Sequence, residues 1–152
     1  MNESLTPKLE AIESYLTDLH DVQPANFEAF EEDKMLRRYT ERILHMTIDT
    51  CIQTGIEVLT EEGLRAPENY HDVFIVLGEH HLLSPLLVKS MTLMVELRNL
   101  LVYEYDVLDH MMIYSVLKKR LDDLQEFVRA IRAYGNKEPY TPSPDFETVP
   151  EE

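Results

Sequence analysis

Glycine and cysteine are both scarce in this chain. Its 152 residues include only 4 glycines and a single cysteine, Cys51. So few glycines leave few of the tight turns that an all-β fold requires. A lone cysteine cannot form a disulfide within the chain, and free cysteines are typical of a reducing compartment. We therefore expect neither an all-β fold nor disulfide staples.

Long apolar runs are missing as well. The longest candidate, residues 82–95, is interrupted by Ser84, Pro85, Lys89 and Ser90. A membrane-spanning helix needs about 20 predominantly apolar residues in succession. No charged and then apolar signal segment opens the chain. The sequence thus predicts a cytoplasmic protein without a membrane partner.

Positive charge is in short supply. The chain carries 29 acidic residues against 14 lysines and arginines, for a net charge of −15. Non-specific binding to nucleic acid depends on many cationic contacts that release counterions. The composition therefore disfavours such binding, although it leaves room for a small local basic site.

Apolar residues make up 44% of the chain, which indicates a globular protein, and the length fits one domain. Their spacing follows the period of a helix. It predicts helices over residues 4–20, 26–60, 69–77, 84–102 and 106–134. The predicted fold is all-α, an antiparallel bundle of four main helices plus one short helix. Wide apolar faces on the long helices suggest a homodimer.

The end of the chain differs in composition from the rest. Residues 137–152 have no apolar period and contain Pro139, Pro142, Pro144 and Pro150. Such a segment buries too little apolar surface to offset the entropy of ordering it. We expect a bundle domain over 1–136 and a disordered, acidic, proline-rich tail over 137–152.

The residues with the most evident chemistry lie in segment 98–105, Arg-Asn-Leu-Leu-Val-Tyr-Glu-Tyr. In one continuous helix Arg98 and Tyr105 share a face, but Tyr103 points elsewhere. The three converge only if the helix ends near Val102 and the chain bends. The acids from Glu104 onward favour a new helix start there. A helix end of this kind would aim the three side chains into a cleft.

This segment resembles the signature of the HepT-like proteins, in which an arginine, usually followed by asparagine, and a spacer precede histidine, one residue and tyrosine. Residues 98–102 match the first part, and Tyr105 matches the closing tyrosine. Tyr103 occupies the position of the histidine. The similarity extends over residues 8–134 and includes Arg42 with Ile43, the stretch 67–74, and Asp109.

The resemblance implies a helical homodimer with an active site in a cleft at the dimer interface. It implies a ribonuclease toxin that cleaves RNA, and a small MNT-type nucleotidyltransferase as the antitoxin that transfers AMP to Tyr105. In the catalytic site so implied, Arg98 would bind the scissile phosphate, Tyr105 would position it and Tyr103 would stand in for the histidine. No cofactor and no metal are expected.

Tyr103 leaves two functions open. The pKa of a free tyrosine is near 10, about 3.5 units above that of histidine. Tyrosine is therefore a poor general base at neutral pH. The chain is either a toxin-type ribonuclease or a non-catalytic dimeric interaction module that retains the scaffold after loss of the histidine.

Simpler explanations compete for the same residues. Arg98 could form an ion pair with Glu104 or Asp106, and Tyr103 and Tyr105 could pack at a dimer seam. The basic residues of the last helix alternate with acids, which favours a solvated, salt-bridged face over an RNA contact. They are Lys118, Lys119, Arg120, Arg129 and Arg132.

Overall fold

A computed structural model describes residues 4–103, 109–144 and 146, and all regular structure in these residues is helical. Its seven helices are α1 (Leu5–Asp21), α2 (Phe27–Glu32), α3 (Lys34–Glu61), α4 (Tyr70–Glu79), α5 (Pro85–Tyr103), α6 (His110–Lys119) and α7 (Leu121–Gly135). The all-α bundle predicted from the spacing of apolar residues is therefore confirmed.

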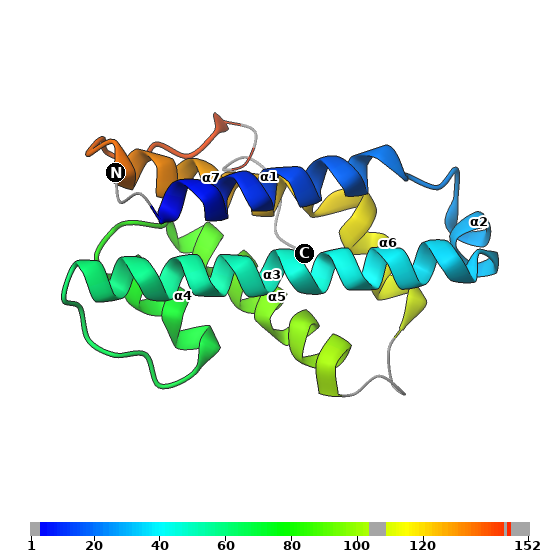
Figure 1. The fold of residues 1–152 in the computed structure, drawn as a ribbon, viewed down its shortest axis with the longest axis horizontal. Coiled ribbons are helices and arrows are strands. Elements are labelled where there is room, and N and C mark those ends of the chain that lie inside the picture. Colours follow the sequence, from blue (N-terminus) through cyan, green and yellow to red (C-terminus); the bar gives the residue numbers. More distant parts are fainter. Residues whose placement is uncertain (1–3, 104–108, 145, 147–152) are drawn as a thin grey trace.

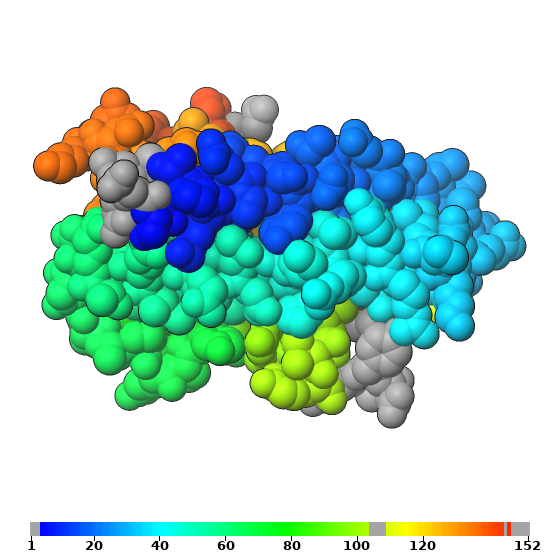
Figure 2. Space-filling view, viewed as in Figure 1, coloured from blue at the N-terminus to red at the C-terminus, as the bar shows by residue number. Residues whose placement is uncertain are grey.

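The longest helix, α3, runs the length of the molecule, and most of the other helices pack against it (Figure 1). The chain turns back at α2, so α1 and α3 are antiparallel neighbours. Helices α4 and α5 pack against another side of α3, and α7 contacts both α1 and α5. Figure 2 shows α3 as a continuous band between α1 and the α4–α5 pair. One face of α3 therefore lies at the surface of the molecule.

Two of the expected helices are each divided in the structure. The helix predicted over 26–60 breaks at Asp33, whose backbone is extended and whose carboxylate accepts the backbone N–H of Leu36 at 3.0 Å. Aspartate competes in this way with helix continuation. The helix predicted over 106–134 breaks at Arg120, and Asp122 and Asp123 occupy the first turn of α7. Neither break contains the glycine or proline that marks most helix ends.

The helix start predicted at Ser84 is confirmed by a capping hydrogen bond, and Asp109, one of the acids near the predicted start of the last helix, caps α6. The Ser84 hydroxyl accepts the backbone N–H three residues later at 3.2 Å, and the Asp109 carboxylate accepts the N–H two residues later at 2.9 Å. Ser4 behaves differently, because its side chain caps nothing and its hydroxyl donates to Glu57 of α3. That bond ties the start of α1 to α3.

The core takes side chains from all seven helices. The rings of Phe74 and Phe127 are fully buried and stand edge to face, with centroids 5.7 Å apart. Gly55 permits the close approach of α4, since a Cβ there would lie 2.6 Å from a methyl group of Val73. Cys51 is fully buried, and burial raises the pKa of its thiol. As expected, it packs as a small hydrophobic residue.

Among the described residues, no helix combines the length and the apolar character that a membrane crossing requires.

Candidate functional site

Arg98 projects from the last two turns of α5 toward α3. Its side chain is only 12% exposed, and its Nε donates a 2.7 Å hydrogen bond to Oδ1 of Asp49. Its Nη1 lies 3.3 Å from the side-chain oxygen of Asn99. A guanidinium buried to this extent requires a carboxylate partner. Asp49 of α3 supplies one, and the neighbouring acids that the sequence suggested, Glu104 and Asp106, lie outside the described residues.

Asp49 contacts a second titratable group as well. Its Oδ2 lies 2.9 Å from Nε2 of His45. The two residues are four apart on α3, so they share one face of that helix. The carboxylate therefore bridges an imidazole and a guanidinium, with one oxygen turned to each.

Two tyrosines flank the guanidinium of Arg98. Its central carbon lies 5.1 Å from the ring centre of Tyr70, the first residue of α4, and 5.9 Å from that of Tyr103. Both distances are within the range of cation–π attraction. Tyr103 is 73% exposed and Tyr70 is also exposed. Exposed aromatic rings beside an arginine are the elements on which nucleic-acid bases stack.

The electrostatics of the site keep Arg98 charged. Burial is the largest influence and acts against the charge, but Asp49 and Tyr103 together outweigh it, so the pKa of Arg98 is raised above its ordinary value. Arginine offers a planar fork of donors that suits the oxygens of a phosphate. We call His45, Asp49, Tyr70, Arg98 and Tyr103 the Arg98 cluster.

The structure brings together two of the three site residues that the sequence predicted. Arg98 and Tyr103 are in contact, and the described part of α5 extends to Tyr103, one residue beyond the expected end at Val102. Tyr105 lies outside the described residues, as do Glu104 and Asp106. The catalytic role of each residue, and the modification of Tyr105, stay predictions.

Sequence reasoning missed Asp49, His45 and Tyr70. The first two lie about fifty residues before Arg98, and only packing brings α3 beside α5. The available signal was the pair His45 and Asp49, one helical turn apart and next to the buried Ile48 and Thr47. Two titratable groups at that spacing on a largely buried helix point to a shared partner on another helix.

The basic residues of α6 and α7 form the salt-bridged face that the sequence favoured. Arg120 lies 3.6 Å from Asp123, Arg129 lies 3.4 Å from Glu126, and Arg132 donates to Glu13 of α1 at 2.6 Å. Lys118 donates to the backbone carbonyl of residue 24. Within the described parts of the chain, no group of three or more histidine, cysteine, aspartate or glutamate side chains is placed to hold a metal ion.

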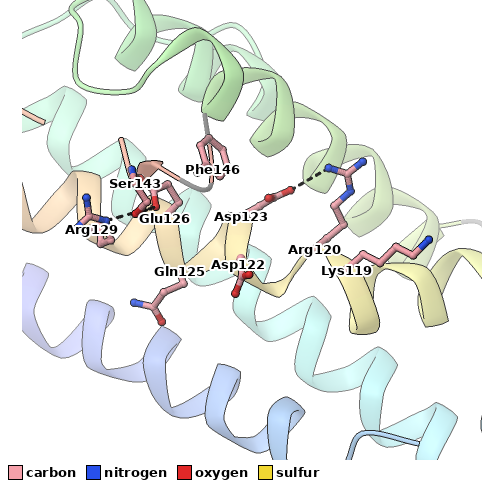
Figure 3. Close-up of a pocket in the computed structure, with 9 residues that line it drawn as sticks. All are labelled: Lys119, Arg120, Asp122, Asp123, Gln125, Glu126, Arg129, Ser143 and Phe146. Atoms are coloured by element: carbon pink, nitrogen blue, oxygen red, sulfur yellow. Dashed lines mark hydrogen bonds and ion pairs between the residues drawn. The ribbon is translucent and has the colours of Figure 1, made fainter. Parts of the chain in front are cut away.

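Away from the Arg98 cluster, a hollow of about 270 Å³ lies between α7 and the segment that follows it (Figure 3). At its edge the buried carboxylate of Glu126 accepts three hydrogen bonds. They come from the Tyr140 hydroxyl at 2.6 Å, the Ser143 backbone N–H at 2.9 Å and the Ser143 hydroxyl at 2.8 Å. The ring of Phe146 is also buried. Residues 137–144 and 146 thus contact the bundle, and the rest of the segment that we expected to be disordered lies outside the described residues.

The contacts of Glu126 lead to a prediction about pH. Burial works against its charge, but the hydrogen bonds from Tyr140 and Ser143 outweigh it and lower the pKa of Glu126. A carboxyl whose folded pKa is below its unfolded value stabilises the protein above the unfolded pKa, and loses this effect as pH falls through the folded pKa. At pH 7 we expect Glu126→Gln to reduce the free energy of unfolding by about 2 kcal/mol.

Urea unfolding at a series of pH values measures the effect. The difference between the native protein and Glu126→Gln should shrink below about pH 4.3, the ordinary glutamate pKa. Glu138→Gln is the matched control, because Glu138 is an exposed carboxylate of the same segment. A difference that stays constant down to acid pH would contradict the assignment of the effect to the charge of Glu126.

The chain is similar in sequence to known nucleases. It is 28% identical over 129 residues to the tRNA nuclease HepT of Aphanizomenon flos-aquae, which covers 84% of this chain and 86% of the relative. It is 24% identical over 133 residues to the mRNA nuclease HepT of Shewanella oneidensis, with 88% and 99% covered.

The fold has close counterparts among solved structures. The tri-AMPylated HEPN toxin of Shewanella oneidensis, solved in complex with its MNT antitoxin, superimposes with a TM-score of 0.82 at 24% identity. The match covers 88% of this chain and 99% of that one. The family model described as ribonuclease HepT-like matches residues 12–131, a range that includes the whole Arg98 cluster. The chain therefore belongs to the ribonuclease HepT-like family.

Proposed function

We propose that this protein is a toxin-type ribonuclease that cleaves RNA at the Arg98 cluster. The observation that carries the proposal is Arg98 itself, a buried cation held by Asp49 between two exposed tyrosine rings. Asp49 binds Nε, so a phosphate would approach the terminal nitrogens of the guanidinium. The adjacent rings of Tyr70 and Tyr103 would stack on the flanking bases.

The local character of this site agrees with the acidic composition of the chain. A net charge of −15 does not hold a nucleic acid through many phosphate contacts. A single buried guanidinium with aromatic neighbours binds one phosphate and its bases instead. We therefore propose an unpaired RNA segment as the substrate, because its bases are free to stack on side chains.

The direct test is cleavage of a single-stranded RNA by the purified protein, with the same sequence in 2′-deoxyribose as the matched control. We expect the RNA to be cut, the DNA to remain intact and EDTA to have no effect. If the RNA also remains intact, the chain is a non-catalytic module that retains the family scaffold. If both are cut, the 2′-hydroxyl has no part in the reaction.

We further propose that the active unit is a homodimer. An apolar hollow of about 310 Å³ lies between α5 and α6, lined chiefly by Leu93, Met94, Leu97, Leu100, Met112 and Val116. Leu93 is 51% exposed at its edge, and Met112 is exposed too. Apolar side chains gathered in this way on a surface mark an interface. The hollow is formed by the same helix that carries Arg98, which would place a second copy beside the cluster.

Leu93→Glu tests the homodimer. A buried carboxylate without a partner is costly at an interface, so we expect the variant to sediment as a monomer at concentrations where the native protein is a dimer. Met35→Glu is the control, because Met35 is a highly exposed apolar residue in the first turn of α3 and does not line the hollow. A Leu93→Glu variant that remains dimeric would place the interface elsewhere.

The partner proposed for this dimer is an MNT-type nucleotidyltransferase. The structural counterpart from Shewanella oneidensis is an AMPylated toxin in complex with such an antitoxin, and Tyr105 is the tyrosine of this chain that matches the family motif. Co-expression with the antitoxin and ATP should add AMP to the native protein, as intact-mass spectrometry would record. Tyr105→Phe should lose that addition, while retention of it would assign another acceptor.

A further inference from the structure

His45 is an imidazole that Asp49 joins to Arg98. Its Nε2 lies 2.9 Å from Oδ2 of Asp49, and Oδ1 of the same carboxylate accepts Arg98 Nε at 2.7 Å. The three side chains therefore form an unbroken chain of contacts from α3 to α5. The His45 ring is partly buried, with about a quarter of the side chain open to solvent. One ring nitrogen is thus held by the carboxylate, while part of the ring stays open to solvent.

The other members of the Arg98 cluster do not supply proton transfer at neutral pH. Free tyrosine has a pKa near 10 and free aspartate one near 4, and Asp49 is in any case engaged as the partner of Arg98. An imidazole is the side chain whose charge ordinarily changes between pH 5 and 8. Cleavage of RNA through its 2′-hydroxyl needs a group of that kind to accept a proton.

We propose that His45 is the proton-transferring residue of this site, oriented by Asp49 and acting on the phosphate that Arg98 binds. The inference rests on the RNA cleavage proposed above and deepens it. It also accounts for a motif in which Tyr103 stands at the position of the histidine. The imidazole comes from α3, where Asp49 lies between it and the guanidinium, and not from the end of α5.

The step is a transesterification within the RNA. With Nε2 facing Asp49, the neutral ring holds its proton there and presents the lone pair of Nδ1. Nδ1 takes the proton of the 2′-hydroxyl, the O2′–P bond forms and the P–O5′ bond breaks. The leaving 5′-oxygen takes a proton from water. The products are a 2′,3′-cyclic phosphate and a 5′-hydroxyl, and Asp49 stabilises the imidazolium that forms.

His45→Ala should reduce cleavage of single-stranded RNA about a hundredfold, as general-base removal does. The control is His20→Ala, since His20 is an exposed histidine in the last turn of α1 and is not part of the Arg98 cluster. Added imidazole should restore part of the activity of His45→Ala but none of the activity of Arg98→Ala. His45→Gln, which keeps a polar side chain of similar reach, should be as inactive as His45→Ala and guards against a folding defect.

A double variant tests the position of the proton acceptor. Tyr103→His places an imidazole against the same guanidinium, because the Tyr103 ring already lies 5.9 Å from it. In the His45→Ala background we expect this change to raise cleavage at least tenfold, whereas in the native background it should add little. A double variant as inactive as His45→Ala would overturn the proposal.

The pH profile gives a readout that a structural role would not change. Among the described residues, the titratable and charged groups of this region include Glu41 and Asp49 on α3 and Arg98 on α5. The others are Tyr70 of α4, Tyr103 of α5 and His110 at the start of α6, which interacts with Glu41. The acid limb of the profile should be present in the native enzyme and absent from the residual activity of His45→Ala. An acid limb unchanged in His45→Ala would assign it to another group and overturn the inference.

The outcomes separate this inference from the function on which it rests. Activity lost in Arg98→Ala but retained in His45→Ala would overturn the role of His45 and leave the ribonuclease intact. Activity equal in the native protein and in Arg98→Ala would overturn both. Loss in both variants, with imidazole rescue confined to His45→Ala, is the result expected.

Discussion

Replacing Arg98 by alanine is expected to lower the rate of RNA cleavage about a thousandfold. A charged donor aimed at the oxygens of a phosphate stabilises the negative charge that builds up in the transition state, and loss of one such donor costs about 10²–10³ in rate. We expect the loss of rate for Arg98→Ala to lie at the upper end of this range, because Arg98 is largely buried and its charge is little screened by water. Single-turnover cleavage of a labelled RNA measures the loss.

The control for this variant is a second arginine that pairs across helices. Arg132 of α7 donates to Glu13 of α1 at 2.6 Å, and its side chain is more exposed than that of Arg98. Arg132→Ala therefore removes an interhelical ion pair without touching the Arg98 cluster, and its cleavage rate should remain within about twofold of the native rate. Equal losses in the two variants would trace the effect to the stability of the bundle.

The parts of this molecule that local pattern controls were predictable from its sequence. Apolar residues at helical spacing located the helices, and Ser84 marked a start that the structure confirms by a capping bond. Arg98 and Tyr103 were identified because the segment that carries them resembles a family motif. Each of these inferences needed only residues within a few turns of one another.

The unpredicted parts depend on contacts between distant residues or on competition at a single residue. The sequence does not reveal that Asp49 faces Arg98, because the packing of α3 on α5 decides it. The break at Asp33 arises because its carboxylate, in place of a backbone carbonyl, accepts the N–H of Leu36. Similarly, the composition of the last segment hides the buried carboxylate of Glu126 that binds Ser143.

Asp49→Ala is the second large effect that we expect, a loss of cleavage of about a hundredfold. Asp49 is a positioning residue: it touches no substrate in the proposed reaction but orients both Arg98 and His45. A displacement of about 1 Å in a reacting or binding group can cost a factor of 10² in rate. Because Arg98 remains present and charged, the loss should fall mainly on kcat, with a smaller change in KM.

Asp49→Asn separates the two tasks of this carboxylate. Its amide oxygen still accepts the hydrogen bond of Arg98 Nε, but its amide nitrogen cannot accept from Nε2 of His45. Phosphate binding should therefore survive in this variant, while the neutral tautomer of His45 and the acid limb of the pH profile change. Glu57→Ala is the matched control, since Glu57 is a carboxylate of α3 that pairs with Lys8 of α1 at 2.8 Å. If Asp49→Ala loses no more activity than Glu57→Ala, Asp49 serves only to hold α3 and α5 together, and the orientation of Arg98 must come from its contacts with Tyr70 and Tyr103.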